Sequence, residues 1–152
     1  MGKLKDKFFQ EACDEYAKRL SSHCKLQIIE LPAIALSDNP SQNEIAAALE
    51  KEATAIIKKI PKQASIYPLC IEGRQLSSED LATELKSNAL SGQPDAVFII
   101  GSSYGLSDEV KRLGKLKLSM SKMTFPHRLA RVMLLEQIYR AFRINGGGKY
   151  HK

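Results

Sequence analysis

DAVFIIGSSYGL, residues 95–106, joins a continuous apolar run to a turn that contains two glycines. The five consecutive apolar residues 96–100 predict a strand buried on both faces, because such a strand has no polar side. Gly101 and Gly105 then allow a tight turn, and a short helix is predicted from about Ser107 to Leu113. A buried strand that turns directly into a helix is typical of a parallel sheet, whose strands are connected through helices.

Strands and helices alternate on both sides of this unit. Apolar runs and alternating patterns predict further strands, and apolar residues at helical spacing predict helices. The predicted strands are 25–31, 65–71 and 115–121, and the predicted helices are 4–20, about 41–60, about 77–92 and about 126–142. The alternation predicts an α/β fold with a mainly parallel sheet and helices on both of its faces. No repeat, low-complexity tract or long linker divides residues 1–152, so a single domain is expected.

Two helix starts carry capping residues. Ser41 and Glu44 form a capping box, in which the serine caps the backbone and the glutamate reaches back. Ser77 and Ser78 precede the helix that ends near Gly92. These signals fix the predicted starts of the two helices more closely than the apolar pattern alone does.

The composition excludes several classes of protein. No apolar run reaches about 18 residues, so no membrane span is expected. The three cysteines, Cys13, Cys24 and Cys70, are far apart and form no C-x-x-C pair, which predicts neither a disulfide framework nor a zinc site. No cluster of His, Cys, Asp and Glu has metal-ligand spacing, so no metal is expected. Free cysteines favour a reducing, cytoplasmic location.

The net charge of +6 is unevenly distributed. Residues 111–152 hold eleven of the 23 basic residues but one of the 17 acidic ones, whereas residues 1–110 carry a net negative charge. A basic C-terminal third points to a polyanion, most simply a nucleic acid. A solvated basic surface is the other interpretation of the same pattern.

Ligands of parallel sheets bind beyond the carboxyl ends of the strands. Three such ends are candidates for a site: Leu69 to Arg74, Gly101 to Gly105, and Met120 to His127. The glycine turn after residue 100 matches neither G-x-G-x-x-G nor a Walker phosphate loop. A ligand-binding loop and an ordinary strand-to-helix turn therefore both remain open for it.

SMSKMTFPHRLARVMLLEQIYRAF, residues 119–142, becomes a helix whose apolar side chains cover about 200° of its circumference. Packing on one sheet needs roughly half of that arc, so a second apolar partner, another subunit, is expected. Arg131 lies in the middle of the arc. A buried arginine needs a carboxylate, a phosphate or backbone carbonyls as its partner, unless its side chain extends past the first turn into solvent.

The C-terminal tail combines three glycines, Gly146 to Gly148, with Lys149, Tyr150, His151 and Lys152. A frayed terminus is the usual interpretation of such a sequence. An aromatic ring, an imidazole and two ammonium groups on a flexible tether also suit RNA, through stacking and phosphate contacts.

Taken together, LCIEGR (69–74), FIIGSSYGL (98–106), LSMSKMTFPHRLARVMLLEQIYRAFRI (118–144) and the terminal YHK resemble the RlmH family of SPOUT-class methyltransferases. The resemblance implies a three-layer α/β domain with a C-terminal trefoil knot, a homodimer, and S-adenosylmethionine as the cofactor. It also implies N3-methylation of a pseudouridine in helix 69 of 23S ribosomal RNA. We expect the assembled ribosomal subunit to be the substrate, because so small a protein has little surface for specificity of its own.

The resemblance also implies site residues. The cofactor contacts would come from the three strand ends, namely Leu69, Gly73, Gly101, Met120, Ser121, Lys122, Met123, Thr124 and Phe125. The groups able to remove the pseudouridine N3 proton, or to stabilise the developing charge, are His127, Arg131, Tyr150 and His151. The residues expected to contact RNA are Arg128, Lys149, Tyr150 and Lys152.

The chain departs from the family pattern at two places. Family members usually have a short apolar strand before the segment that here reads KLK, where Met1 and Gly2 precede it, and many have a second glycine at the position of Ser102. Two other functions remain as alternatives: a SPOUT enzyme acting on transfer RNA, and a non-catalytic basic RNA-binding domain. Binding of S-adenosylmethionine would separate the enzymes from the binding domain.

Overall fold

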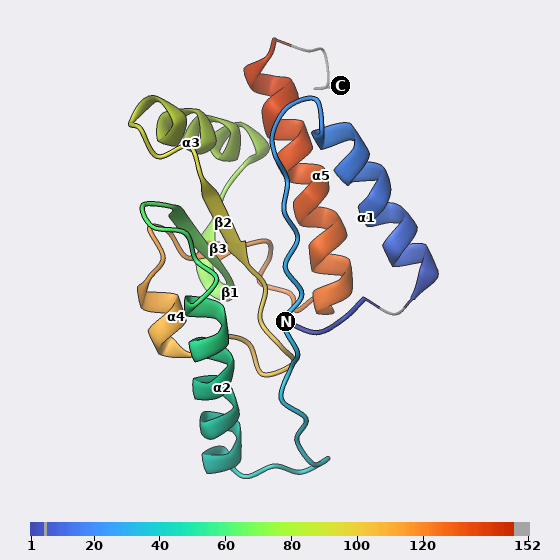
Figure 1. The fold of residues 1–152 in the computed structure, drawn as a ribbon, viewed down its shortest axis with the longest axis vertical. Helices are drawn as coiled ribbons and strands as arrows, with labels where there is room; N and C mark the ends of the chain where they lie inside the picture. The colour runs from blue at the N-terminus through green and yellow to red at the C-terminus, as the bar shows by residue number, and fades with distance from the viewer. Residues whose placement is uncertain (5, 148–152) are drawn as a thin grey trace.

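The computed structural model describes residues 1–4 and 6–147. Its elements, in chain order, are α1 (Lys7–Leu20), α2 (Gln42–Ile57), β1 (Ser65–Gln75), α3 (Ser78–Leu90), β2 (Ala96–Ile99), α4 (Asp108–Arg112), β3 (Leu118–Ser119) and α5 (His127–Asn145) (Figure 1). The predicted tail residues Lys149, Tyr150, His151 and Lys152 lie outside the described residues.

The three strands form a parallel sheet in the order β2-β1-β3, which confirms the predicted α/β class. The ladder between β1 and β2 pairs Ser65 with Ala96 through to Pro68 with Ile99. The ladder between β1 and β3 is irregular, because Leu69 and Arg74 both pair with Leu118. Residues 70–73 therefore bulge out of the central strand at its carboxyl end.

Helices cover both faces of the sheet. On one face, Ile99 of β2 packs with Ala53 and Ile56 of α2 and with Val110 of α4. On the other face, Phe98 packs with α1, α3 and α5. The alternation of neighbouring side chains across a strand puts 98 and 99 on opposite faces, which produces three layers (Figure 1).

The capping signals in the sequence are present in the structure. Ser41 and Glu44 form the predicted capping box of α2, and Ser77 forms one with Asp80 at the start of α3. Ser107 caps α4 through the amide of Val110. Pro126 precedes the first residue of α5, where a missing N–H costs nothing.

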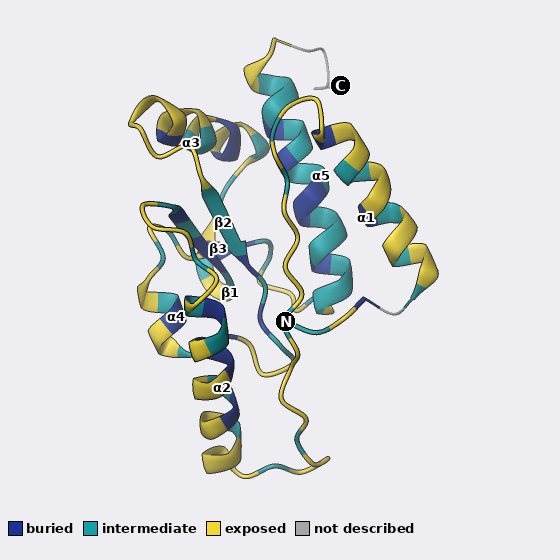
Figure 2. Cartoon of the chain, viewed as in Figure 1, coloured by how far each residue is buried: buried dark blue, intermediate teal, exposed yellow. Residues whose placement is uncertain are grey.

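The wide apolar arc of α5 is largely explained within the chain. The buried residues Leu134, Leu135 and Ile138 pack with α1, and Ala141 packs with α3. Two helices, α1 and α3, flank α5, and most of α5 is coloured buried or intermediate in Figure 2. The arc therefore does not by itself require a second subunit, which corrects the reasoning from the sequence.

The predicted strand at 25–31 is wrong. This segment is extended but belongs to no strand of the described structure, and Ile28 and Ile29 remain 44% and 45% exposed. A strand needs a neighbouring ladder of hydrogen bonds, and among residues 1–4 and 6–147 this segment forms one backbone bond to another segment, from the Gly2 amide to the Leu31 carbonyl at 2.8 Å. The apolar pattern was strand-like, but the backbone lacks a paired neighbour.

Two other predictions changed at their boundaries. The predicted strand 115–121 shortens to the two residues of β3, while β1 continues four residues beyond its predicted end. The strand at 96–99 lies at the edge of the sheet, so Ala96, Val97 and Phe98 are half-buried rather than enclosed on both sides. No helix among the described residues has the length and apolarity to cross a membrane.

Candidate active site at the strand ends

Residues from β1 and from the segments that follow β2 and β3 come together, although Leu69 lies in the middle of β1 and not at its carboxyl end. Leu69 from β1, Ile100 after β2 and Met120 after β3 pack against one apolar cluster that includes Leu134 and Ile138 of α5. The structure thus brings together two predicted cofactor residues, Leu69 and Met120, and a third, Gly101, directly follows Ile100 of the same cluster. Parallel strands whose ends meet are where ligands of α/β proteins bind.

The turn after β2 explains why Gly101 is a glycine. A Cβ at this position would lie 2.3 Å from the carbonyl oxygen of Gly105. Ser102 and Gly105 exchange backbone hydrogen bonds of 3.2 and 3.0 Å, and Gly105 has a positive φ of 82°. The absence of a side chain at 101 is therefore required by the turn itself, whether or not a ligand approaches.

The structure also explains why position 73 is a glycine. A Cβ there would lie 2.7 Å from the carbonyl oxygen of Lys117, and the neighbouring Arg74 amide donates to that same oxygen at 2.8 Å. The glycine lets the end of β1 approach the segment that leads into β3. Gly73 contacts the backbone of residues 117–118, which leads into the loop after β3. A larger residue at 73 would therefore affect a ligand by moving this backbone.

The loop after β3 presents polar groups to solvent above the apolar cluster. Ser119 Oγ donates to the Ser121 carbonyl at 3.0 Å, and the Met123 amide donates to Ser121 Oγ at 3.0 Å. Met123 is 71% exposed, and Lys122 and Thr124 are also exposed. A loop held by its own serines, with an apolar floor beside it, can offer both backbone and side-chain contacts to a polar ligand.

His127 is the first residue of α5 and lies directly after this loop. Burial lowers the pKa of the imidazole, and the nearby positive charges, including those of Arg128 and Arg131, lower the pKa further. The imidazole is therefore mainly neutral at neutral pH. A neutral imidazole can accept a proton, which is what a general base needs to do.

Arg131 has a carboxylate partner, one of the three kinds of partner that its place in the apolar arc predicted. Its Nη1 lies 2.6 Å from Glu30 Oε1, and 15% of its side chain is exposed. The pKa of Glu30 is lowered, mainly by this hydrogen bond. Arg128, which the resemblance assigned to RNA contact, forms an ion pair with Asp6.

Asp6 and Glu30 were missed by the sequence analysis. No spacing connects either residue with α5, because more than a hundred positions separate the partners of each pair. The available signal was the unmatched buried arginine, which predicted that a partner exists but not where it lies in the sequence.

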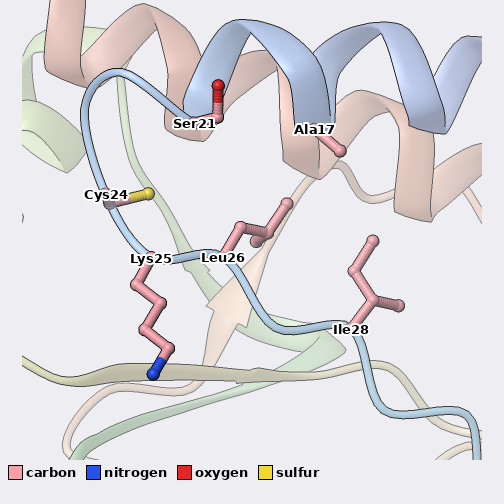
Figure 3. Close-up of a pocket in the computed structure, with 6 residues that line it drawn as sticks. All are labelled: Ala17, Ser21, Cys24, Lys25, Leu26 and Ile28. Atoms are coloured by element: carbon pink, nitrogen blue, oxygen red, sulfur yellow. The ribbon is translucent and has the colours of Figure 1, made fainter.

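Two cavities lie along α1 and the extended segment 24–30. The first, of about 580 Å³, is lined by Ala17, Ser21, Cys24, Lys25, Leu26 and Ile28 (Figure 3). The second, of about 560 Å³, shares Ile28 and includes Glu30 and Arg131. Neither is lined by a predicted cofactor residue. Residues 1–4 and 6–147 contain no group of three or more His, Cys, Asp or Glu placed to hold a metal ion.

Comparison with known proteins identifies the family. A family model described as "Predicted SPOUT methyltransferase" matches residues 1–151. The chain belongs to the SPOUT methyltransferase family. It is also 47% identical over all 152 residues to a protein of Methanococcus maripaludis (strain C5 / ATCC BAA-1333) named "Putative ribosomal RNA large subunit methyltransferase H", covering 96% of that protein. The resemblance inferred from the sequence motifs is confirmed.

Proposed function

We propose that this SPOUT methyltransferase transfers a methyl group from S-adenosylmethionine to N3 of the helix 69 pseudouridine of 23S ribosomal RNA. The observation that carries the proposal is the packing of Leu69, Ile100 and Met120 on one apolar cluster, in a chain 47% identical to a protein named "Putative ribosomal RNA large subunit methyltransferase H". The name of this relative favours ribosomal RNA over transfer RNA as the substrate. The assembled large subunit in the cytoplasm is the proposed substrate, and the trefoil knot belongs to the proposal through the resemblance.

The residues at the strand ends suit the proposed cofactor. Leu69 and Met120 supply apolar contact, and residues 121–125 supply a loop whose polar groups face solvent. Gly101 and Gly73 set the backbone positions of the two neighbouring turns. When bound, S-adenosylmethionine supplies an electrophilic methyl group on a sulfonium, so the protein's main task is to position the reactants.

The residues of α5 supply the acid–base chemistry in this proposal. The neutral imidazole of His127 can accept the N3 proton, and the Arg131 guanidinium, held by Glu30, can stabilise negative charge that develops on the base. Tyr150 and His151 are the other two candidates. The proposal leaves the choice of base among these groups to mutagenesis.

A homodimer is also part of the proposal, on the strength of the family resemblance. The apolar arc of α5 no longer supports it, since α1 and α3 cover much of that arc. The outer surface of α1 supports it instead, because Phe8 is 64% exposed beside Phe9, with the two ring centroids 4.1 Å apart. An exposed phenylalanine on a surface helix, here beside the half-buried Phe9, is the type of feature found in subunit interfaces.

Titration calorimetry with S-adenosylmethionine tests the enzymatic part of the proposal. We expect saturable binding with one site per chain, and the same heat of binding in Lys18→Gln, a control at an exposed position of α1. Absence of binding at millimolar cofactor would contradict the proposed methyl donor and would favour the non-catalytic RNA-binding domain.

A further inference from the structure

Four basic residues gather where β1 runs beside β3, the outer strand of the sheet. We call this group the basic edge, and it consists of Arg74, Lys111, Lys115 and Lys117. Arg74 follows the bulge of β1, and its amide donates to the Lys117 carbonyl at 2.8 Å. The other two residues flank the turn that leads from α4 to β3.

Three carboxylates, Glu72, Glu84 and Asp108, act on these four cations. Glu72 lies 2.7 Å from Lys111, and the charge of Lys117 also acts on it. Glu84 lies 2.8 Å from Lys115, and the charge of Arg74 also acts on it. Glu72 and Glu84 are each shared between two cations, and Asp108 also acts on Lys111, so four cations face three carboxylates and the basic edge has one positive charge in excess.

The excess falls on Arg74 and Lys117. Both residues are exposed, and no ion pair within 4.0 Å is formed by either one among the described residues. No acidic residue occurs between Glu109 and Glu136 to supply another partner from the following chain. Two cations that lie on adjacent backbone segments and form no close ion pair among the described residues are suited to contact an anion with regularly spaced charges.

A second role for lysines at this place must be considered. Charged side chains on an outer strand discourage pairing with another sheet. Here β3 has two residues, so little unpaired edge is exposed. Arg74 lies on the central strand β1 and does not need to protect an edge. Protection of the edge therefore does not explain the whole group.

The place of the basic edge in the fold relates it to the candidate active site. Lys117 lies three residues before Met120, a distance of about 10 Å along an extended chain. The backbone of Gly73 and Arg74 packs directly on residues 117–118, which lead into the loop 120–125, the proposed cofactor-binding loop. An RNA strand held at the basic edge would therefore lie beside the proposed cofactor.

We propose that Arg74 and Lys117 bind phosphates of the substrate RNA and thereby hold the target nucleotide next to the loop 120–125. This inference rests on the proposed function, because it takes the substrate to be RNA. It adds two contacts from the sheet to those expected from α5 and the tail. Their role is binding and positioning, since neither side chain belongs to the proposed acid–base group.

The test is the double variant Arg74→Gln/Lys117→Gln. Its control is Lys51→Gln/Lys58→Gln, which removes the same charge from exposed positions of α2 and the residue after it. The probe is a fluorescein-labelled helix 69 stem-loop RNA, whose dissociation constant is measured by anisotropy at several KCl concentrations. Calorimetry with S-adenosylmethionine and thermal melting are measured on the same preparations.

We expect the double variant to bind the stem-loop about tenfold more weakly. The slope of the logarithm of the binding constant against the logarithm of the salt concentration should become less steep by about 1 to 2. Its affinity for S-adenosylmethionine and its melting temperature should match those of the control. Equal RNA affinity and equal slope in the two double variants would overturn the inference while leaving the proposed function intact. If the unmodified protein bound neither the RNA nor the cofactor, the proposed function and the inference would both be overturned.

The single variant Lys117→Gln keeps the test decisive if the double variant folds poorly. The structural contacts of Lys117 are made by its backbone carbonyl, so the side-chain change leaves them in place. A loss of about 0.7 to 1 in the salt slope is expected for one lost phosphate contact. An unchanged slope would count against the role of Lys117.

Discussion

At the level of single residues, the ion pair between Arg131 and Glu30 joins α5 to the extended segment 24–30, and more than a hundred positions of sequence separate the two partners. The position of Arg131 within an apolar arc predicted a buried cation with a partner, and the structure confirms a carboxylate at 2.6 Å. The identity of that partner could not be predicted, because ion pairs between distant segments follow no spacing rule. The same holds for Asp6 and Arg128.

The pair should make stability depend on pH in a defined direction. The pKa of Glu30 is lowered in the folded protein, so its contribution is complete above the unfolded value of about 4.3 and is lost as the pH falls through the folded pKa. Glu30→Gln should therefore cost about 1 to 2 kcal/mol of unfolding free energy at pH 7, because Arg131 loses its carboxylate. The cost should be smaller at pH 3 than at pH 7, because the carboxylate is increasingly protonated as the pH falls towards the folded pKa.

Urea denaturation of both proteins at pH 7 and pH 3 measures this difference. Glu15→Gln is a matched control, because Glu15 pairs with Arg19 on the exposed surface of α1 and should matter little. A Glu30 variant as stable as the control at pH 7 would show that the ion pair is not a structural contact.

At the scale of elements, the strongest predictions came from local signals. The predicted capping box of α2, the Ser77 cap of α3 and the long helix α5 depend on neighbouring residues, and all three formed. The segment 25–31 failed because a strand depends on a partner that its own sequence does not specify. The close approach of Gly101 to Gly105 and of Gly73 to Lys117 likewise depends on how the chain folds. The sequence therefore could not predict why these two positions need a glycine.

A buried polar network fixes α3 beneath the sheet. Tyr67 of β1 is fully buried and donates its hydroxyl proton to Glu84 Oε1 at 2.9 Å, while the Asn88 amide donates to the same hydroxyl. Lys115 joins the network by donating to Asn88 Oδ1 at 2.6 Å. Elements α3, β1 and the approach to β3 are thereby held by four polar side chains.

Tyr67→Phe should destabilise the protein by about 1 to 3 kcal/mol, because it leaves the buried Asn88 amide without its acceptor. Chemical denaturation measures the change, and Tyr104→Phe, at a 44% exposed position, is the control. A loss below about 0.5 kcal/mol would mean that the Asn88 amide finds another acceptor.

At the scale of the whole molecule, the α/β class followed from the alternation of strands and helices, while the trefoil knot and the homodimer entered through the family resemblance. Periodicity describes which face of an element is apolar, but it does not say how the chain threads or how many chains assemble. The wide arc of α5 illustrates this point, since intramolecular neighbours proved sufficient to cover much of it.

The proposed homodimer can be tested at the surface of α1. The protein should sediment as a dimer at micromolar concentration, and Phe8→Lys should shift it towards monomer while its melting temperature changes little, because Phe8 is 64% exposed. Leu90→Lys, at an 80% exposed position of α3, is the control. Sedimentation of the unmodified protein as a monomer would contradict the proposal, and equal effects of both variants would place the interface elsewhere.

Deletion of Lys149–Lys152 tests the proposed role of the tail. These residues follow α5, which ends at Asn145, so thermal stability and cofactor affinity should remain nearly unchanged. Methylation of RNA should fall by about a hundredfold if a positioned acid–base group is lost. Tyr150→Phe and His151→Ala would then separate the hydroxyl from the imidazole. Full activity of the truncated enzyme would reduce the tail to a terminus without function.

The central claim is that this chain methylates a pseudouridine of large-subunit ribosomal RNA. The most direct measurement incubates the protein with S-adenosylmethionine and ribosomal subunits from cells lacking the modification, followed by mass spectrometry of the RNA nucleosides and fragments. The account predicts one N3-methylpseudouridine per subunit, located in helix 69, and none without the protein. An unmodified helix 69 in the presence of a protein that binds the cofactor would contradict it.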